Sequence, residues 1–263
     1  MYRQIKSCYR LSGLIGPDLY RRRKAFFSAH DHIDYFSVPI FIISYNRFTY
    51  LQGLVKRLKN MGYTNINIID NHSTYPPLLN FYKETDCRVF RLPKNYGHMV
   101  FWECELFSCY RDDLYVVTDP DIMPTDDCPN DFVEKLYRCL KRFPRIRKAG
   151  LSLKIDDIPQ EAPLHDEVVK WENQFNKVKF PFSDFYVADV DTTLALYIPD
   201  SLDVSRRFLT AIRLDKPYQI RHLPWYKKRE DVSKEDTFYA ESRETGFWDE
   251  TEGKIRVELD YSH

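Results

Sequence analysis

An apolar run followed at once by a polar loop recurs along the first half of the chain, and this recurrence constrains the fold most strongly. The first run, residues 38–43, is apolar on both faces, as a buried parallel strand requires. Similar runs occupy 66–69, 88–92 and 114–117, with helical patterns between them. Repeated strand–helix alternation predicts an α/β protein with a mostly parallel central sheet and helices on both faces.

Start and stop signals delimit the helices between these strands. Thr49, with Gln52 three residues later, has the spacing of a capping box, and Gly62 is placed to end the same helix. Pro76 and Pro77 suit the first turn of the next helix, where proline is tolerated. The apolar stripe of the first helix consists of Leu51, Leu54, Val55 and Leu58.

The second half of the chain is less regular. Residues 187–198 predict one further strand, 221–226 form a turn-rich segment, and the chain is highly charged from about residue 229. These changes divide the sequence into an N-terminal arm at 1–36 packed on the core, a main domain at 37–228, and a charged C-terminal tail at 229–263.

Composition excludes some classes of protein. The 39 basic and 39 acidic residues cancel, so the overall charge does not indicate nucleic-acid binding. None of the six cysteines forms a C-x-x-C pair, which argues against a zinc ribbon or a redox motif and fits reduced thiols in a cytoplasmic enzyme. The chain shows neither a signal peptide nor an apolar run of about 18 residues, the length of a membrane span.

One cluster of basic and aromatic residues, at 20–27, has two interpretations. It is either a solvated face of a helix, or a surface that attaches peripherally to an anionic membrane or glycolipid.

Polar clusters follow three of the predicted strands. In open parallel α/β sheets the ligand binds at the carboxyl ends of the strands, so these clusters are expected to converge on one site. They comprise Ser44, Tyr45, Asn46 and Arg47 after the first strand, Asp70 and Asn71 after the second, and Asp119, Pro120 and Asp121 after the fourth.

The last cluster predicts a metal site. Proline fixes the backbone between Asp119 and Asp121, so that both carboxylates can face one ligand. Carboxylate oxygens suit Mg²⁺ or Mn²⁺, which proteins hold with one or two such groups and the phosphates of a substrate.

Asp70 has two interpretations, shared by Asn71. At the end of a strand its carboxylate can accept hydrogen bonds from a ribose hydroxyl or a base N–H, or it can cap a helix or close an Asx-turn. Lys94 and Arg91 are candidates to offset the charge of a diphosphate, although such loop residues are commonly solvated.

The order of these segments resembles the GT-A glycosyltransferases, in particular the inverting family-2-type group. The resemblance covers residues 37–125 and resumes at 190–197 and 221–226. It implies a Rossmann-like GT-A fold, a nucleoside-diphosphate sugar as donor, a glycan or glycolipid acceptor, and Mn²⁺ or Mg²⁺. In this family the first loop and the acid after the second strand hold the nucleotide, and the D-x-D acid binds the metal. Asp70-Asn71 replaces the family's usual pair of acids.

The resemblance also suggests residues in the second half. GT-A enzymes often take a third metal ligand from a late loop, for which His222 is the candidate; a histidine hydrogen-bonded in the core is the alternative. Asp191 is the candidate general base, with Asp189, Glu235 and Asp236 as rivals.

Other classes of protein remain open. A sugar nucleotidyltransferase would share the sheet and the metal, but its Gly-rich loop is absent after the first strand. A haloacid-dehalogenase-type phosphatase would have Thr or Val where Met123 stands. A non-catalytic glycan-binding relative fits the same residues.

Overall fold

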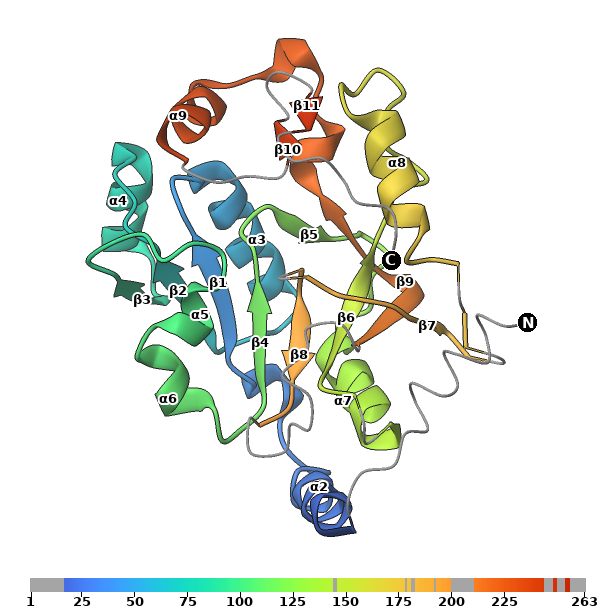
Figure 1. Ribbon diagram of the computed structural model, residues 1–263. Helices are drawn as coiled ribbons and strands as arrows, with labels where there is room; N and C mark the ends of the chain where they lie inside the picture. Colours follow the sequence, from blue (N-terminus) through green and yellow to red (C-terminus); the bar gives the residue numbers. More distant parts are fainter. Residues whose placement is uncertain are drawn as a thin grey trace.

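The computed structural model describes residues 17–143, 146–177, 179–180, 183–191, 193–199, 211–243, 248–249 and 254–255. Its centre is a nine-stranded sheet in the order β3-β2-β1-β4-β8-β6-β9-β5, with β7 paired to β9 (Figure 1). The strands of this sheet are β1 (Ile40–Ser44), β2 (Ile66–Asp70), β3 (Arg88–Arg91), β4 (Tyr115–Thr118), β5 (Ile122–Pro124), β6 (Lys148–Leu153), β7 (Phe185–Val187), β8 (Ala195–Tyr197) and β9 (Ala211–His222).

Helices connect these strands, and a small hairpin pairs β10 (Trp248–Asp249) with β11 (Lys254–Ile255). The α-helices are α2 (Pro17–Ala29), α3 (Phe48–Asn60), α4 (Pro76–Glu84), α5 (Val100–Glu103), α6 (Leu106–Tyr110), α7 (Phe132–Arg142), α8 (His165–Asn173) and α9 (Lys234–Ser242). The 3₁₀ helices are η1 (Tyr35–Ser37), η3 (Leu223–Tyr226) and η4 (Arg229–Asp231).

Most strands of the sheet point the same way. β1 is parallel to β2 and β4, and β2 is parallel to β3. Beyond β4, the antiparallel strand β8 lies between β4 and β6, and β6 is parallel to β9. β5 and β7 run antiparallel to β9. The carboxyl ends of β1, β2 and β4 therefore meet at one edge.

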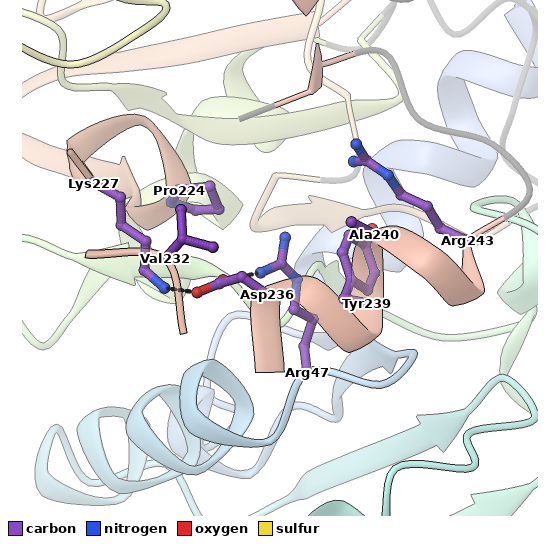
Figure 2. A pocket seen from close by; sticks show the side chains of 8 residues that line it. All are labelled: Arg47, Pro224, Lys227, Val232, Asp236, Tyr239, Ala240 and Arg243. Carbon is purple, nitrogen blue, oxygen red and sulfur yellow. Dashed lines mark hydrogen bonds and ion pairs between the residues drawn. The ribbon is translucent and has the colours of Figure 1, made fainter. Parts of the chain in front are cut away.

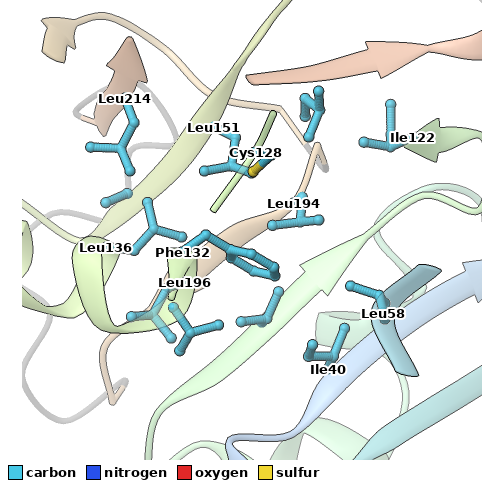
Figure 3. Packing of buried hydrophobic residues seen from close by; sticks show 14 of the residues in the cluster. Ile40, Leu58, Ile122, Cys128, Phe132, Leu136, Leu151, Leu194, Leu196 and Leu214 are labelled. Carbon is cyan, nitrogen blue, oxygen red and sulfur yellow. The ribbon is translucent and has the colours of Figure 1, made fainter. Parts of the chain in front are cut away.

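Alternating residues of the strands fill two cores, one on each face. Ile40 and Ile42 of β1 pack with α3 and α7 in the larger core, part of which is drawn in Figure 3. Phe41 and Ile43 point the other way and pack with residues of α5 and α6. The predicted α/β class, with a mostly parallel sheet covered on both faces, is confirmed.

The helix signals were correct in part. Gly62 follows the end of α3 with a φ of 98°, a conformation that glycine adopts without strain, and Pro76 opens α4. The capping box was wrong, because α3 already includes Thr49 and the Arg47 side chain makes no cap. Between β3 and β4 the helical pattern corresponds to two short helices, α5 and α6, which are separated by Cys104 and Glu105.

The strand expected over 187–198 is two short strands, β7 and β8, that lie in different parts of the sheet. Between them the chain crosses over β6, where Val190 lies against Gly150. The apolar pattern of the sequence could not reveal this crossing. Apolar residues are buried in both strands and also in the segment between them, so the pattern is the same as in one continuous strand. The turn-rich segment expected at 221–226 begins with the last two residues of β9 and continues as the short 3₁₀ helix η3.

Part of the predicted N-terminal arm is visible as α2, at the opposite end of the molecule from α9 (Figure 1); residues 1–16 lie outside the described residues. Within the 20–27 cluster, Arg23 and Phe27 are buried and Tyr20 is exposed. The backbone oxygen of Phe27 accepts a hydrogen bond from Tyr137 of α7. One side of the cluster thus packs on the domain, and peripheral membrane contact stays a prediction.

None of the helices in the described part of the chain is both long and apolar enough to cross a membrane. The cysteines among the described residues are free thiols, and Cys8 lies outside them. The domain boundaries at 36 and 228 stay predictions.

Candidate functional site

The pairing of β5 with β9 brings two predicted metal ligands together. Ile122 is the register partner of His222, so Asp121 lies at the end of the same ladder. The backbone oxygen of Asp121 accepts a hydrogen bond from Leu223 at 2.9 Å, and its Oδ2 lies 3.7 Å from His222 Nε2. Both side chains are largely buried. Two segments separated by a hundred residues in the sequence thus meet at this edge.

The separation of Asp121 and His222 can be compared with the reach of a metal ion. Two metal–ligand bonds of about 2.1 Å span up to about 4.2 Å, so one ion can contact both groups at their present separation. The ring nitrogen Nδ1 of His222 is buried with no hydrogen-bond partner among the described residues. No cluster of three or more His, Cys, Asp or Glu side chains suited to a metal occurs in the part of the chain that the structure describes. Asp119 is partly exposed, and its backbone oxygen accepts from Thr118 Oγ1 at 3.1 Å.

Asp70 is fully buried and hydrogen-bonded within the protein. Its Oδ1 accepts from the backbone of Ser73 at 2.9 Å and from Tyr82 at 3.3 Å, and its Oδ2 accepts from Arg91 Nε at 3.1 Å. Burial raises the pKa of the Tyr82 phenol, and the charge of Asp70 raises it further, so this hydroxyl stays protonated as a donor. The geometry favours the Asx-turn interpretation, while direct contact of Asp70 with a nucleotide stays a prediction.

Asn46 and Asn71 hold the loops at this edge together. Asn46 has a φ of 52°, a left-handed conformation in which asparagine is enriched, and its Oδ1 accepts from the backbones of Thr74 and Tyr75. The Asn71 side chain donates to the Gly97 oxygen at 3.0 Å. Its Oδ1 also accepts from the Tyr96 backbone. The two asparagines therefore fix the loops that follow β1, β2 and β3. Ser44 is buried, with its hydroxyl oxygen 3.2 Å from that of Tyr82, and Lys94 is exposed.

The helix α9 covers the loop after β1. Tyr45 donates from its hydroxyl to the Ser242 oxygen at 2.7 Å. The guanidinium of Arg47 donates to Asp236 at 2.8 Å and lies 3.8 Å from the centre of the Tyr239 ring. Within the charged segment that begins at about residue 229, α9 therefore packs against the loop after β1, at the edge of the sheet where the ligand is expected.

Both rivals for the general base on α9 have other partners. Glu235 is buried and accepts from the backbone and hydroxyl of Thr49 at 2.9–3.1 Å, so it caps α3 from a different segment. Asp236 is buried between Arg47 and Lys227. Burial raises the pKa of Asp236, but hydrogen bonds from Lys227 and Ser233 outweigh this, and the net pKa is lowered.

Asp191 is exposed and lies in the segment that crosses β6. Two buried basic side chains hold the backbone just before it: Lys148 Nζ donates to the Val190 oxygen, and Arg213 Nε donates to the Asp189 oxygen at 2.5 Å. Arg213 is itself paired with buried Glu172 at 2.6 Å. The side chain of Asp191 is thereby carried on a fixed segment of backbone.

Sequence reasoning missed Lys148, Arg213 and Lys227, which contribute to these arrangements, and Arg243, whose guanidinium lies 5.5 Å from the centre of the Tyr239 ring. Lys148 begins β6 in an otherwise small and apolar strand, and a lone basic residue in such a run is a signal of burial with a partner. Lys227 and Arg243 stand in charged surroundings that offered no comparable signal.

No family model matches the chain, and no curated protein matches it. Among solved structures, the chain is similar to a crystal structure of residues 1–349 of S. aureus TarS, with 12 % identity and a TM-score of 0.41, over 80 % of this chain and 74 % of that one. It is also similar to a second crystal structure of S. aureus TarS, with 11 % identity and a TM-score of 0.41, over 78 % of this chain and 42 % of that one.

Proposed function

We propose that this protein is a GT-A-type glycosyltransferase that moves a sugar from a nucleoside-diphosphate sugar to a hydroxyl of a glycan or glycolipid, with Mn²⁺ or Mg²⁺ as cofactor. The observation that carries the proposal is the meeting of Asp121 with His222 at the carboxyl edge of the parallel strands, beside the loops after β1 and β2. Ligands of open α/β sheets bind at this edge.

In the proposed site Asp121 and His222 would hold the metal, and Asp119, two residues before Asp121 in the chain, is proposed as a further ligand. Bound there, the metal would neutralise the charge of the departing nucleoside diphosphate. The loops containing Tyr45, Asn46 and Asn71 would contact the nucleotide. Their backbones are already fixed by hydrogen bonds, so binding would cost little ordering of the protein.

Asp191 is the proposed general base. The acceptor hydroxyl gives its proton to the carboxylate while its oxygen bonds to the anomeric carbon, and the bond from that carbon to the diphosphate oxygen breaks with inversion. Two observations support this role. Asp191 is exposed, and hydrogen bonds from Lys148 and Arg213 fix the backbone carbonyls of the two residues before it. A base held on a fixed backbone loses less entropy on reaching the transition state.

Thermal unfolding with a panel of nucleotides tests the proposal. UDP, GDP, CMP and dTDP would each be added with and without Mn²⁺. A nucleotide at 100 times its dissociation constant adds about 2.7 kcal/mol to the free energy of unfolding, which raises the melting temperature measurably. We expect one nucleoside diphosphate to stabilise the protein, and more strongly with Mn²⁺. If none does at millimolar concentration, the proposed function is wrong.

A further inference from the structure

Thr193 carries a buried hydroxyl that lacks a hydrogen-bond partner in the part of the chain that the structure describes. The residue retains 8 % of its accessible surface. By contrast, the buried carboxylate of Asp236 at the same edge accepts from both Arg47 and Lys227 (Figure 2). A buried hydroxyl without a partner has lost its hydrogen bonds to water and gained none in return. Such a group in a native structure needs an explanation, and a ligand that binds there is one.

The residue after Thr193 adds a second unfavourable feature. Leu194 has a φ of 41°, in the left-handed region that is rare for a bulky side chain. Its side chain is fully buried, and its backbone oxygen accepts from the Leu151 backbone at 3.4 Å. Strained backbone persists only where the surrounding structure holds it, and it is concentrated at ligand-binding sites. An unpaired hydroxyl and a strained backbone thus occur at consecutive residues.

The pairing of β8 with β4 places Thr193 beside the predicted metal site. The last pair of this antiparallel ladder is Val117 with Ala195. Asp119 follows Val117 by two residues, and Thr193 precedes Ala195 by two, so both lie beyond the same end of the ladder. Neighbouring strands are about 4.8 Å apart, so the two residues lie on adjacent paths of the chain at the carboxyl edge.

Thr193 is also close in the chain to Asp191, the proposed general base. In an inverting transfer the base and the leaving group are on opposite faces of the sugar. The sugar would therefore lie between Asp191 and the metal that Asp121 and His222 would hold. Thr193 stands two residues after Asp191 and beside Asp119, which is the position that such a sugar would occupy. A threonine hydroxyl suits a sugar, because the hydroxyls of both can donate and accept hydrogen bonds.

We propose that the Thr193 hydroxyl binds the sugar of the nucleotide-sugar donor and contributes to the choice of sugar. The hydroxyl turns about χ1 towards the sugar when the donor binds, and makes the hydrogen bond that it lacks in the free protein. The inference rests on the proposed function for the identity of the donor. It gives a reason for a hydroxyl at a place where valine, which has the same shape, would leave nothing unpaired.

Thr193→Val gives the first test, because it replaces the hydroxyl with a methyl group of nearly the same size. We expect the variant to unfold at a higher urea concentration than the wild type, since an unpaired buried hydroxyl is removed. Thr125→Val is the matched control. Thr125 is also buried, but its hydroxyl donates to the Gln219 oxygen at 3.1 Å, so this variant should unfold at a lower concentration. An unchanged or lower midpoint for Thr193→Val would overturn the inference.

Calorimetric titration with Mn²⁺ then separates the sugar from the nucleotide. The probes are UDP, GDP and dTDP, together with UDP-glucose, UDP-N-acetylglucosamine, GDP-mannose and dTDP-glucose. For the conjugate that the wild type binds most tightly, we expect Thr193→Val to lower the affinity about three- to tenfold, the effect of one neutral hydrogen bond. The matching nucleoside diphosphate should bind equally to both proteins. Thr193→Ser keeps the hydroxyl and should bind the conjugate within about twofold of the wild type.

The outcomes distinguish this inference from the proposed function. If the sugar conjugate binds equally to the wild type and to Thr193→Val, the sugar contact is wrong and the proposed function stands. Weaker binding of the free nucleoside diphosphate by the variant, to the same degree as the conjugate, would also overturn the sugar contact. If no nucleoside diphosphate and no conjugate binds to the wild type, the proposed function is wrong and the inference falls with it.

Discussion

Lys148→Met is expected to change how the stability of the protein depends on pH. Lys148 is 1 % exposed, and burial lowers the pKa of its ammonium to about 7, against an ordinary value of 10.5, although the charge of Asp191 opposes this. Between these two values the unfolded chain holds a proton that the folded protein has released. The free energy of unfolding therefore rises with pH over this range because of Lys148.

The size of the effect follows from the two pKa values. At pH 7 the folded lysine is half protonated and the unfolded one almost fully, whereas at pH 9 the folded lysine is neutral. Integrating the difference in bound protons gives about 2 kcal/mol of added stability between pH 7 and pH 9. Methionine does not titrate, so the variant lacks this contribution. It also leaves the Val190 oxygen without the hydrogen bond from Nζ, a loss that is the same at both pH values.

Urea unfolding at pH 7, 8 and 9 measures the effect. The difference in unfolding free energy between the two proteins should change by about 2 kcal/mol in favour of the wild type as the pH rises from 7 to 9. Other titrating groups are common to both proteins and cancel in this difference. A constant difference across the range would mean that Lys148 titrates in the folded protein as it does in the unfolded chain, and would refute the reasoning.

The remaining predictions concern packing, capping and the metal. Gly150→Ala should cost about 1–3 kcal/mol in urea unfolding, because its new Cβ would lie 2.7 Å from Val190 Cγ1. Gly53→Ala, inside α3 with only an ordinary contact, should instead stabilise by about 0.5–1 kcal/mol, and the reverse order would contradict the packing described. Glu235→Ala should cost about 0.5–2 kcal/mol through the lost cap on Thr49, an effect that the exposed Glu241→Ala should not share. His222→Ala should raise the Mn²⁺ concentration needed for half-maximal activity; an unchanged metal titration with lower thermal stability would make His222 a core residue.

The first half of the fold could be predicted because local pattern and tertiary structure agree there. The apolar runs became parallel strands, which are buried in β1, β2 and β4 and partly exposed in the edge strand β3. Gly62 and Pro76 acted by conformational preferences that need no partner. The two strands within 185–197 could not be separated from the sequence. Their division depends on Val190 crossing over Gly150, which is a contact between distant segments.

The sequence predicted the residues of the candidate site individually, and the structure shows which of them lie close together. Asp121 and His222 were named separately, and the β5–β9 ladder brings them together. The partners of Arg47 and Thr49 on α9 could not be foreseen, because a charged segment looks the same whether it is solvated or bound to buried groups. Long-range ion pairs leave no periodic signature in a sequence.

Hydrolysis or transfer from a panel of nucleotide sugars, measured for the wild type and for Asp121→Asn with Mn²⁺ present, tests the central claim most directly. The account predicts release of one nucleoside diphosphate by the wild type, and loss of that activity in a variant that melts at the same temperature. Full activity of Asp121→Asn at ordinary Mn²⁺ concentration, or no release from any donor by the wild type, would contradict it.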